Sequence, residues 1–469
     1  MTVRGSIDDA VVLHRLGKLE DADEIYASVL VKEPFNTQVL SLRGLIAESR
    51  GNLSDAIKYF EAANQIRPGD LNICLQLGML YSANRNFDAS NQLYEGISSV
   101  YPESIEVLVN HGNNLTKQGR YEDALDKYKK ALLLESESAR INYNIGVMYL
   151  KCMDPDSAVP YLEKATDLDR KYFSAWNNLG VALSQIGDLE AALDAYQKAL
   201  SIDAQDMEAL FNVHSVCLDL NQPESAIESL KNAIKLGNPA TTLKFFLAII
   251  LNSYGRAAEG NALLQSISDD ESIRAEQSSW AYIESRAQDL PLLVGTEIRT
   301  FELALYNAKL DGLILEFGVY NGKSIRRLAT LASQSIHGFD SFEGIPEAWN
   351  DEPKGSYSAL GKLPHVPNHV VLHKGWFDET LPIFIEEFRG PIRLLHIDCD
   401  LYSSTRTILN LLSKQIQKGT VIVFDEFIGY KTWADDEFKA FIEATEEYHW
   451  DYQILSFSFV TKQVALIIK

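Results

Sequence analysis

The sequence predicts an all-α helical-repeat solenoid followed by an α/β domain with a doubly wound, mostly parallel sheet. Glycines recur every 34 residues through the first half of the chain. In the second half, short apolar runs typical of buried strands alternate with amphipathic helical stretches. We expect the solenoid in residues 1–270, linker helices in 271–310 that lead into the next domain, and the α/β domain with a closing antiparallel strand pair in 311–469.

The composition is that of a globular protein. Of the 469 residues, 46% are hydrophobic and 23% are charged. The net charge of −22 disfavours binding to nucleic acids or to anionic membranes. The longest apolar run, Phe245 to Leu251, is too short to span a bilayer, and the N-terminus lacks the apolar segment of a signal peptide.

The cysteines point to a reducing compartment. They are scattered, with no CxxC pair, which argues against a disulfide framework or a cysteine-type zinc site. They are Cys74, Cys152, Cys217 and Cys399. We therefore expect a cytoplasmic location.

The 34-residue period has a physical explanation in paired helices. The glycines in register are Gly44, Gly78, Gly112, Gly146 and Gly180. Two helices approach closely only where side chains are small, and a large residue sixteen positions later, such as Tyr94 or Tyr196, is placed to fill the gap between them. Proline or a short polar stretch then ends the second helix.

This pattern resembles the tetratricopeptide repeat (TPR), with residues 176–199 as the best-matching unit. We expect seven copies in residues 7–237 and a degenerate eighth, in 241–270, that caps the stack. The fourth copy departs from the pattern at Asp154–Pro155, where we expect a local distortion.

A second register of the same period consists of carboxamides. These are Asn110, Asn144, Asn178 and Asn212. In the repeat family this position faces the groove, and a carboxamide can donate to and accept from a peptide backbone. The sequence leaves open a peptide groove, a site for a partner protein or a second subunit, and a simple role in helix packing.

The α/β domain is predicted from its alternating elements. The expected strands are 313–317, 336–339, 369–372, 393–397, 420–424, 452–457 and 463–468, and the expected helices are 323–331, 377–388, 404–416 and 435–447. Ligands of such sheets bind at the carboxyl ends of the strands.

The first strand ends in a glycine-containing segment, Glu316 to Ser324. A phosphate-binding P-loop needs four residues between Gly318 and the Gly-Lys-Ser triplet, and this chain has three. The GxGxxG dinucleotide fingerprint is absent. An acidic residue before the glycines suits a cofactor that carries an ammonium and a sulfonium group, as S-adenosylmethionine does.

Acidic residues also follow the later strands. Asp340, 24 residues after Glu316, is placed to accept the hydroxyls of a ribose, or alternatively to cap the next helix. Asp398 and Asp400 follow one strand, and Asp425 and Glu426 follow another. Their mutual repulsion predicts a bound hard cation such as Mg²⁺ or another divalent ion, unless some of them cap helices, as Asp400 could.

Five ordered motifs in residues 310–445 resemble the macrocin O-methyltransferase family (TylF/MycF-like), whose members are Rossmann-like class I methyltransferases. The motifs are EFGVYNGKSI, GFDSFEGIPE, GWFDETLP, HIDCDLYSST and VFDEF. Members use S-adenosylmethionine and a divalent metal to methylate sugar hydroxyls. The family usually has two adjacent aspartates where this chain has Asp425 and Glu426, and often glycine where it has Cys399.

The resemblance implies a set of site residues. The methionine end of the cofactor would be lined by Glu316, Gly318, Tyr320, Asn321 and Ser324. Asp340 and Ser341 would hold the ribose, and Gly375, Trp376 and Phe377 would lie near the adenine. Asp398, Asp425 and Glu426 would bind the metal.

The general base is assigned to Asp398 or Asp400, and His373 and His396 are interpreted as structural. We therefore expect a metal-dependent O-methyltransferase acting on a sugar hydroxyl of a saccharide, glycolipid or glycosylated metabolite, with a TPR module for partner binding or self-association. The alternatives are a repeat scaffold with a degenerate second domain, and a related small-molecule hydroxylase on the same fold.

Overall fold

The computed structural model describes residues 6–237, 240–286 and 289–469. The chain forms two compact units. The first runs through Cys152 and includes Lys164–Arg170, and the second comprises Met153–Glu163 and Lys171–Lys469. Within the described ranges, no helix combines the length and the apolar character needed to cross a membrane.

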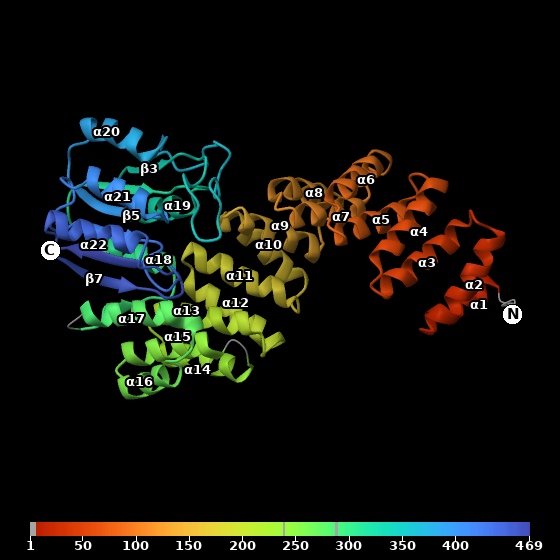
Figure 1. The fold of residues 1–469 in the computed structure, drawn as a ribbon, viewed down its shortest axis with the longest axis horizontal. Coiled ribbons are helices and arrows are strands. Elements are labelled where there is room, and N and C mark those ends of the chain that lie inside the picture. The colour runs from red at the N-terminus through yellow and green to blue at the C-terminus, as the bar shows by residue number, and fades with distance from the viewer. Residues whose placement is uncertain (1–5, 238–239, 287–288) are drawn as a thin grey trace. The chain divides into compact units, whose positions relative to one another are not determined.

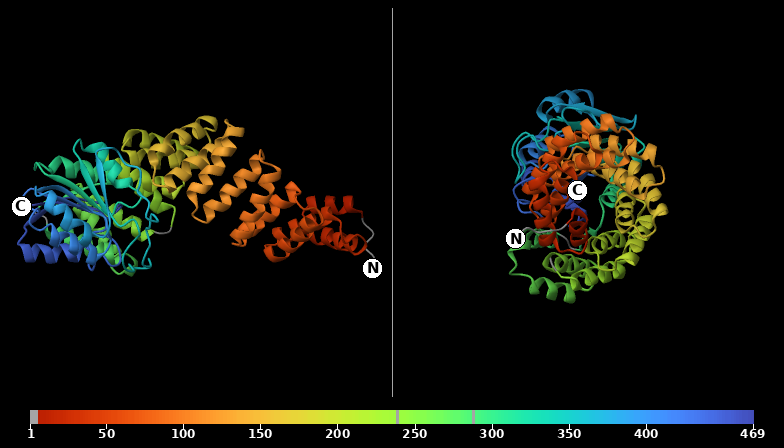
Figure 2. Two further views of the ribbon diagram at one scale, coloured as in Figure 1. Left: turned by 90° about the horizontal axis from the view of Figure 1, so that it is seen from above. Right: turned by 90° about the vertical axis from the view of Figure 1, so that its right-hand side faces the viewer.

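The repeat array consists of helical hairpins (Figures 1 and 2). Its helices are α1 (Ile7–Arg15), α2 (Leu19–Lys32), α3 (Thr37–Ser49), α4 (Leu53–Ile66), α5 (Leu71–Ala83), α6 (Phe87–Val100), α7 (Ile105–Lys117), α8 (Tyr121–Leu134), α9 (Ala139–Lys151), α10 (Pro155–Leu168), α11 (Phe173–Ile186), α12 (Leu189–Ile202), α13 (Met207–Asp219), α14 (Pro223–Lys235), α15 (Ala240–Ser253) and α16 (Ala257–Ser266). The array is a TPR solenoid, as the period predicts.

Short polar side chains begin many of these helices. The residues before α4, α5 and α13 are Asn52, Asp70 and Asp206, and each side chain accepts a hydrogen bond from a backbone N–H of the first turn. Such caps satisfy donors that the helix itself leaves unpaired. The polar residues between the apolar stretches therefore set where each helix starts.

The periodic glycines lie where two helices of a hairpin touch. A Cβ added at Gly44 would lie 2.5 Å from Phe60, and one at Gly180 would lie 2.5 Å from Tyr196. Gly78 and Gly112 face Tyr94 and Tyr128 in the same way, each at 2.6 Å. These distances are far below a normal carbon–carbon contact, so the prediction that small residues make room for the aromatic ring is confirmed.

The second unit contains one mixed sheet. Its described strands are β1 (Leu292–Leu293), β2 (Leu313–Phe317), β3 (Ile336–Asp340), β4 (Val370–Lys374), β5 (Ile392–Ile397), β6 (Val421–Phe424), β7 (Tyr452–Phe457) and β8 (Val464–Ile468). They lie in the order β1-β7-β8-β6-β5-β2-β3-β4, and only the β6–β8 and β7–β8 pairs are antiparallel. The chain winds away from β2 toward β4 and from β5 toward β8, so the order reverses between β2 and β5.

Helices cover this sheet. They are α17 (Arg274–Arg286), α18 (Glu297–Asn307), α19 (Lys323–Leu331), α20 (Phe377–Glu387), α21 (Tyr402–Leu411) and α22 (Glu437–Tyr448). The buried side chains of α18 and α19 form one core with the strands, including Phe301, Ile314 and Ile325. The expected helix 404–416 instead begins at Tyr402, with Leu401 as its N-terminal cap, so Asp400 does not cap it.

The last repeats pack directly on the α/β domain within the second unit. The Asp219 carboxylate of α13 accepts hydrogen bonds from the Gly295 backbone (2.8 Å) and the Thr296 hydroxyl (2.6 Å). Thr296 is also the N-terminal cap of α18. A Cβ on Gly295 would lie 1.9 Å from the Ser215 carbonyl oxygen, so the two segments approach as closely as glycine permits.

The segment after α17 also supplies an edge strand, which the sequence analysis did not foresee. Leu292 and Leu293 pair in parallel with Ser456 and Phe457 of β7. A two-residue strand leaves no alternating pattern in the sequence, so its pairing depends on the neighbouring strand alone.

Replacing Gly180 with alanine is expected to destabilise the protein by about 1–3 kcal/mol, because its Cβ would overlap the buried ring of Tyr196. Gly96 is the control: it lies within α6, is exposed, and an added Cβ there meets no atom within 4 Å. Gly96→Ala should stabilise by about 0.5–1 kcal/mol, since glycine is a poor helix former. Urea denaturation measures both, and equal effects of the two substitutions would contradict the hairpin packing.

The Asp219 carboxyl gives this contact a pH dependence. Burial raises its pKa from the ordinary value to about 6. The folded state therefore binds a proton more readily than the unfolded state, and the contribution of Asp219 to stability is present at about pH 4 and is lost as the pH rises through 6. Relative to Asp219→Asn, the wild-type free energy of unfolding should fall by about 1–2 kcal/mol between pH 4 and 7. Parallel pH profiles of the two proteins would refute this.

Candidate active site

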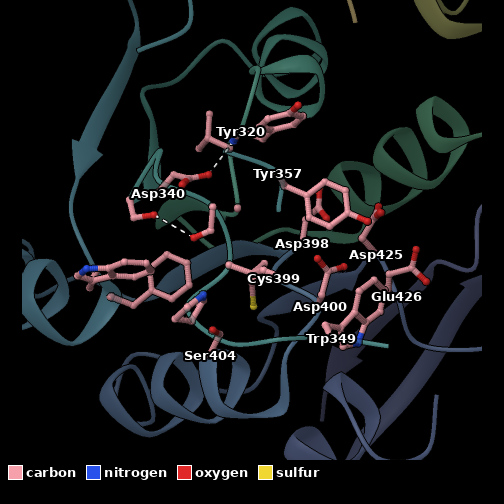
Figure 3. Close-up of a pocket in the computed structure, with 18 of the residues that line it drawn as sticks. Tyr320, Asp340, Trp349, Tyr357, Asp398, Cys399, Asp400, Ser404, Asp425 and Glu426 are labelled. Carbon is pink, nitrogen blue, oxygen red and sulfur yellow. Dashed lines mark hydrogen bonds between the residues drawn. The ribbon is translucent and has the colours of Figure 1, made fainter. Parts of the chain in front are cut away.

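A cavity of about 720 Å³ opens at the carboxyl ends of the strands, beside the point where the strand order reverses (Figure 3). Most of the sequence-predicted site residues line it. They are Gly318, Tyr320, Asn321, Ser324, Asp340, Ser341, Trp376, Phe377, Asp398, Asp400, Asp425 and Glu426. Doubly wound sheets bind their ligands at this position.

The segment Gly318–Gly322, called the glycine loop below, packs tightly beneath the cavity. Gly318 has a φ of +93°, and a Cβ there would lie 1.6 Å from the Asp398 carbonyl oxygen. The same glycine N–H donates to the Phe339 carbonyl oxygen at 3.0 Å. Only glycine fits between these neighbours, so the loop backbone itself forms the floor of the cavity.

Asp340 organises the same loop. Its Oδ2 accepts a hydrogen bond from the Tyr320 N–H (2.7 Å), and its Oδ1 accepts one from the Phe342 N–H (2.6 Å). Burial raises the pKa of this carboxyl, and the backbone donors partly offset that rise. Each oxygen keeps a second lone pair, so the carboxylate can hold the loop and still accept from a ligand hydroxyl.

Glu316 and Gly375 lie outside the group of residues that line the cavity. Glu316 is fully buried, accepts a hydrogen bond from the Ser324 hydroxyl at 2.9 Å, and has a raised pKa caused by its burial. Gly375 adopts a φ of +145° and donates its N–H to the Asp340 carbonyl oxygen. Both residues support the cavity wall from behind.

Four carboxylates from two strand ends gather in one part of the cavity. Asp398 and Asp400 follow β5, and Asp425 and Glu426 follow β6 (Figure 3). Burial, together with the negative charge of Asp425, raises the pKa of Asp398. Burial raises the pKa of Asp400 and that of Glu426 to about 7 each. The oxygen donors suit a hard divalent cation, whose charge would offset this repulsion.

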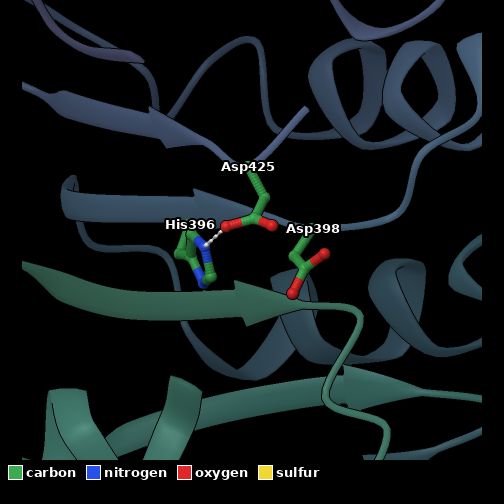
Figure 4. Close-up of side chains that lie close together, drawn as sticks. All are labelled: His396, Asp398 and Asp425. Carbon is green, nitrogen blue, oxygen red and sulfur yellow. Dashed lines mark ion pairs between the residues drawn. The ribbon is translucent and has the colours of Figure 1, made fainter. Parts of the chain in front are cut away.

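His396 lies under this group and is fully buried (Figure 4). Its Nδ1 is 3.0 Å from Glu316 Oε2, and its Nε2 is 3.8 Å from Asp425 Oδ1. Burial alone would lower the pKa of His396, but the two carboxylates raise it well above its ordinary value. The pKa of Asp425 falls although burial opposes this, because the His396 imidazolium stabilises the carboxylate. His396 and one oxygen each of Asp398 and Asp425 lie within 4.8 Å of one another.

Two lysines also lie close to the carboxylates. Lys462 Nζ is 3.2 Å from Glu426 Oε2, and Lys323 Nζ is 2.7 Å from Glu297 Oε2 at the cavity wall. The ammonium of Lys462 already compensates Glu426, whereas Asp398 has no lysine or arginine partner among the described residues. A cation at this site would therefore depend most on Asp398 and Asp425.

Sequence reasoning missed the role of Glu437 in α22. This side chain is fully buried, and its carboxylate accepts hydrogen bonds from the N–H groups of Cys399 (3.3 Å), Asp400 (3.2 Å) and Glu426 (3.3 Å). Burial raises its pKa well above the ordinary value. A signal was present: Glu437 shares the buried helix face of Ala440 and Phe441, where a carboxylate is costly unless it has partners.

The periodic asparagines are half-buried on the first helices of their hairpins. They are Asn110 in α7, Asn144 in α9, Asn178 in α11 and Asn212 in α13. The Asn178 carboxamide donates to the Ser174 carbonyl oxygen of its own helix at 2.9 Å. This bond uses one donor and leaves the carboxamide oxygen for other contacts.

Comparison with protein families agrees with this architecture. A family model described as a methyltransferase domain matches residues 315–427. The second half contains a methyltransferase domain. Models of the tetratricopeptide repeat match residues 10–70, 112–151, 139–172 and 173–206. The chain thus combines TPR repeats with a methyltransferase domain. None of the curated proteins compared with it matches.

Several solved structures resemble parts of the chain. The crystal structure of YrrB, described as a TPR protein with an unusual peptide-binding site, is 23% identical, covers 39% of this chain and 94% of its own, and has a TM-score of 0.35. MamA is 23% identical, with coverages of 34% and 94% and a TM-score of 0.33. Pseudomonas aeruginosa pilF is 21% identical, with coverages of 45% and 97% and a TM-score of 0.40.

Replacing Glu437 with alanine should cost about 2–4 kcal/mol of stability, because three buried N–H groups lose their acceptor. Glu437→Gln keeps the shape and one acceptor oxygen, so its cost should stay within about 1 kcal/mol. Urea denaturation of the two variants checks this. Equal losses for alanine and glutamine would show that the side chain acts through its charge and not through these bonds.

Proposed function

We propose that the chain is an S-adenosylmethionine-dependent and divalent-metal-dependent O-methyltransferase whose acceptor is a sugar hydroxyl of a saccharide, glycolipid or glycosylated metabolite. The observation that carries the proposal is the meeting of the glycine loop with four carboxylates in one cavity of a methyltransferase domain. The resemblance of five ordered motifs to the macrocin O-methyltransferase family supports the choice of acceptor.

The residues present fit the cofactor. Gly318 leaves backbone at the cavity floor where any side chain would collide, which suits close approach by a ligand. Tyr320, Asn321 and Ser324 would face the methionine end, with Glu316 orienting Ser324 from behind. Asp340 and Ser341 would accept and donate at the ribose. When bound, S-adenosylmethionine supplies a methyl group made electrophilic by its sulfonium.

The adenine would lie against Trp376 and Phe377, which line the cavity near the start of α20. Flat aromatic faces bind a purine ring without placing a charge beside it. Gly375 would act indirectly, because its N–H holds the Asp340 carbonyl oxygen and thereby fixes the turn that carries Trp376.

The metal would be held by Asp398, Asp425 and Glu426. Such an ion would lower the pKa of an acceptor hydroxyl and hold it in place. Asp398 and Asp400 are the proposed catalytic carboxylates: both line the cavity, and either would accept the hydroxyl proton. Trp349 and Tyr357 line the same cavity and offer flat apolar faces on which a sugar ring can stack.

The TPR module is proposed to bind a protein partner or to mediate self-association. TPR repeats present an extended surface suited to this role. The half-buried carboxamides of Asn110, Asn144, Asn178 and Asn212 are the proposed groove contacts.

Isothermal titration calorimetry with S-adenosylmethionine tests the cofactor assignment. The wild-type protein should bind it, and Gly318→Ala should abolish binding because the new Cβ would collide with the Asp398 carbonyl. Asp311→Asn is the control, since Asp311 is exposed and precedes β2 at the opposite edge of the sheet. A wild-type protein that does not bind the cofactor would refute the enzyme and favour a scaffold.

Methyl transfer to a panel of glycosylated acceptors, followed by mass spectrometry, tests the metal. Chelation by EDTA should remove turnover, and Mg²⁺ should restore it. Asp398→Asn should lower turnover by about 10²-fold or more while leaving S-adenosylmethionine affinity within about threefold. Turnover that EDTA leaves unchanged would remove the metal from the mechanism.

A further inference from the structure

The turn of the fourth repeat is the place where the repeat pattern breaks, and it belongs to the same compact unit as the methyltransferase domain. Met153 adopts a φ of 57°, a left-handed conformation that costs energy for a residue with a side chain. Asp154–Pro155 follows and begins α10. Met153 also lines the cavity, beside residues of the glycine loop. A repeat residue thus forms part of the candidate active site.

Arg326 in α19 connects this turn to the glycine loop. Its Nη2 donates to the Met153 carbonyl oxygen at 2.8 Å. Its Nη1 donates to the carbonyl oxygens of Asn321 (2.8 Å) and His365 (3.4 Å). The planar guanidinium donates in several fixed directions at once, so a single side chain joins three backbone segments.

Arg327, the next residue, makes a second connection. It is 4% exposed, and its guanidinium forms an ion pair with the Asp156 carboxylate in the first turn of α10. Among the residues that the structure describes, Asp156 is the ion-pair partner of Arg327. A buried guanidinium without a partner is strongly unfavourable, so α19 depends on this repeat residue for its packing.

We propose that the fourth-repeat turn, Met153–Asp156, is a positioning element of the cofactor site. It holds α19 and the glycine loop through Arg326 and Arg327, and it completes the cavity wall with Met153. The break in the repeat pattern then has a physical reason, because a regular turn would not direct the Met153 carbonyl and the Asp156 carboxylate at α19. This inference rests on the proposed binding of S-adenosylmethionine in the cavity.

The test compares Asp156→Asn with Glu190→Gln. Glu190 lies 34 residues later, in the first turn of α12, and is exposed, so its change removes the same charge from the same repeat position. Asp156→Asn should raise the Kd and the KM for S-adenosylmethionine about five- to tenfold while kcat at saturation stays within about twofold. Asp156→Glu, which keeps the charge, should restore most of the affinity, and Glu190→Gln should match the wild type.

Hydrogen exchange without cofactor separates this inference from the proposed function. The backbone amides of residues 318–326 should exchange faster in Asp156→Asn than in the wild type or in Glu190→Gln. If the wild-type protein does not bind S-adenosylmethionine, the proposed function fails, and exchange alone decides whether the turn orders the loop. Wild-type affinity and wild-type exchange in Asp156→Asn would overturn the inference.

Arg326→Lys decides the matter if Asp156→Asn does not fold. A lysine ammonium cannot reach the three carbonyl oxygens in the directions that the guanidinium uses. The same rise in Kd and the same faster exchange at residues 318–326 are expected. Unchanged values in a folded Arg326→Lys variant would overturn the proposal.

Discussion

The ion pairs of His396 with Glu316 and Asp425 join the ends of three neighbouring strands, β2, β5 and β6. All three strands run in parallel, so their acidic ends meet at one edge of the sheet. Without a buried cation there, the desolvated carboxylates would repel one another across a few ångströms. The imidazolium allows Glu316 to support Ser324 on one side and Asp425 to face the cavity on the other.

Glu437 and Lys462 complete this compensation from the other side. Glu437 accepts the backbone N–H groups of the residues that follow β5 and β6, so the two strand ends share one acceptor. Lys462 approaches Glu426 from the turn before β8. The antiparallel β7–β8 pair is therefore part of the site's support, since it brings this ammonium to the end of β6.

The repeats and the catalytic domain are physically continuous within the second unit. Asp219 holds the start of α18 from α13, and Asp156 and Met153 hold the start of α19 from the fourth repeat. Each contact places a repeat residue against a helix end beside the sheet. Events on the repeats can reach the cavity through these contacts, because they constrain backbone that the site itself uses.

The sequence by itself determined the repeat period, the order of strands and helices, and the strand-end acids. These are local properties: a 34-residue spacing, an apolar run and a terminal acid can each be read without knowing what lies opposite. Only the tertiary structure decided how the charges are shared. His396 was interpreted as structural and proved to bridge two carboxylates, Glu316 proved to lie behind the cavity, and Glu437, Lys462 and Asp156 gained partners from distant parts of the chain. Charge compensation depends on distances in space, which residue spacing alone does not encode.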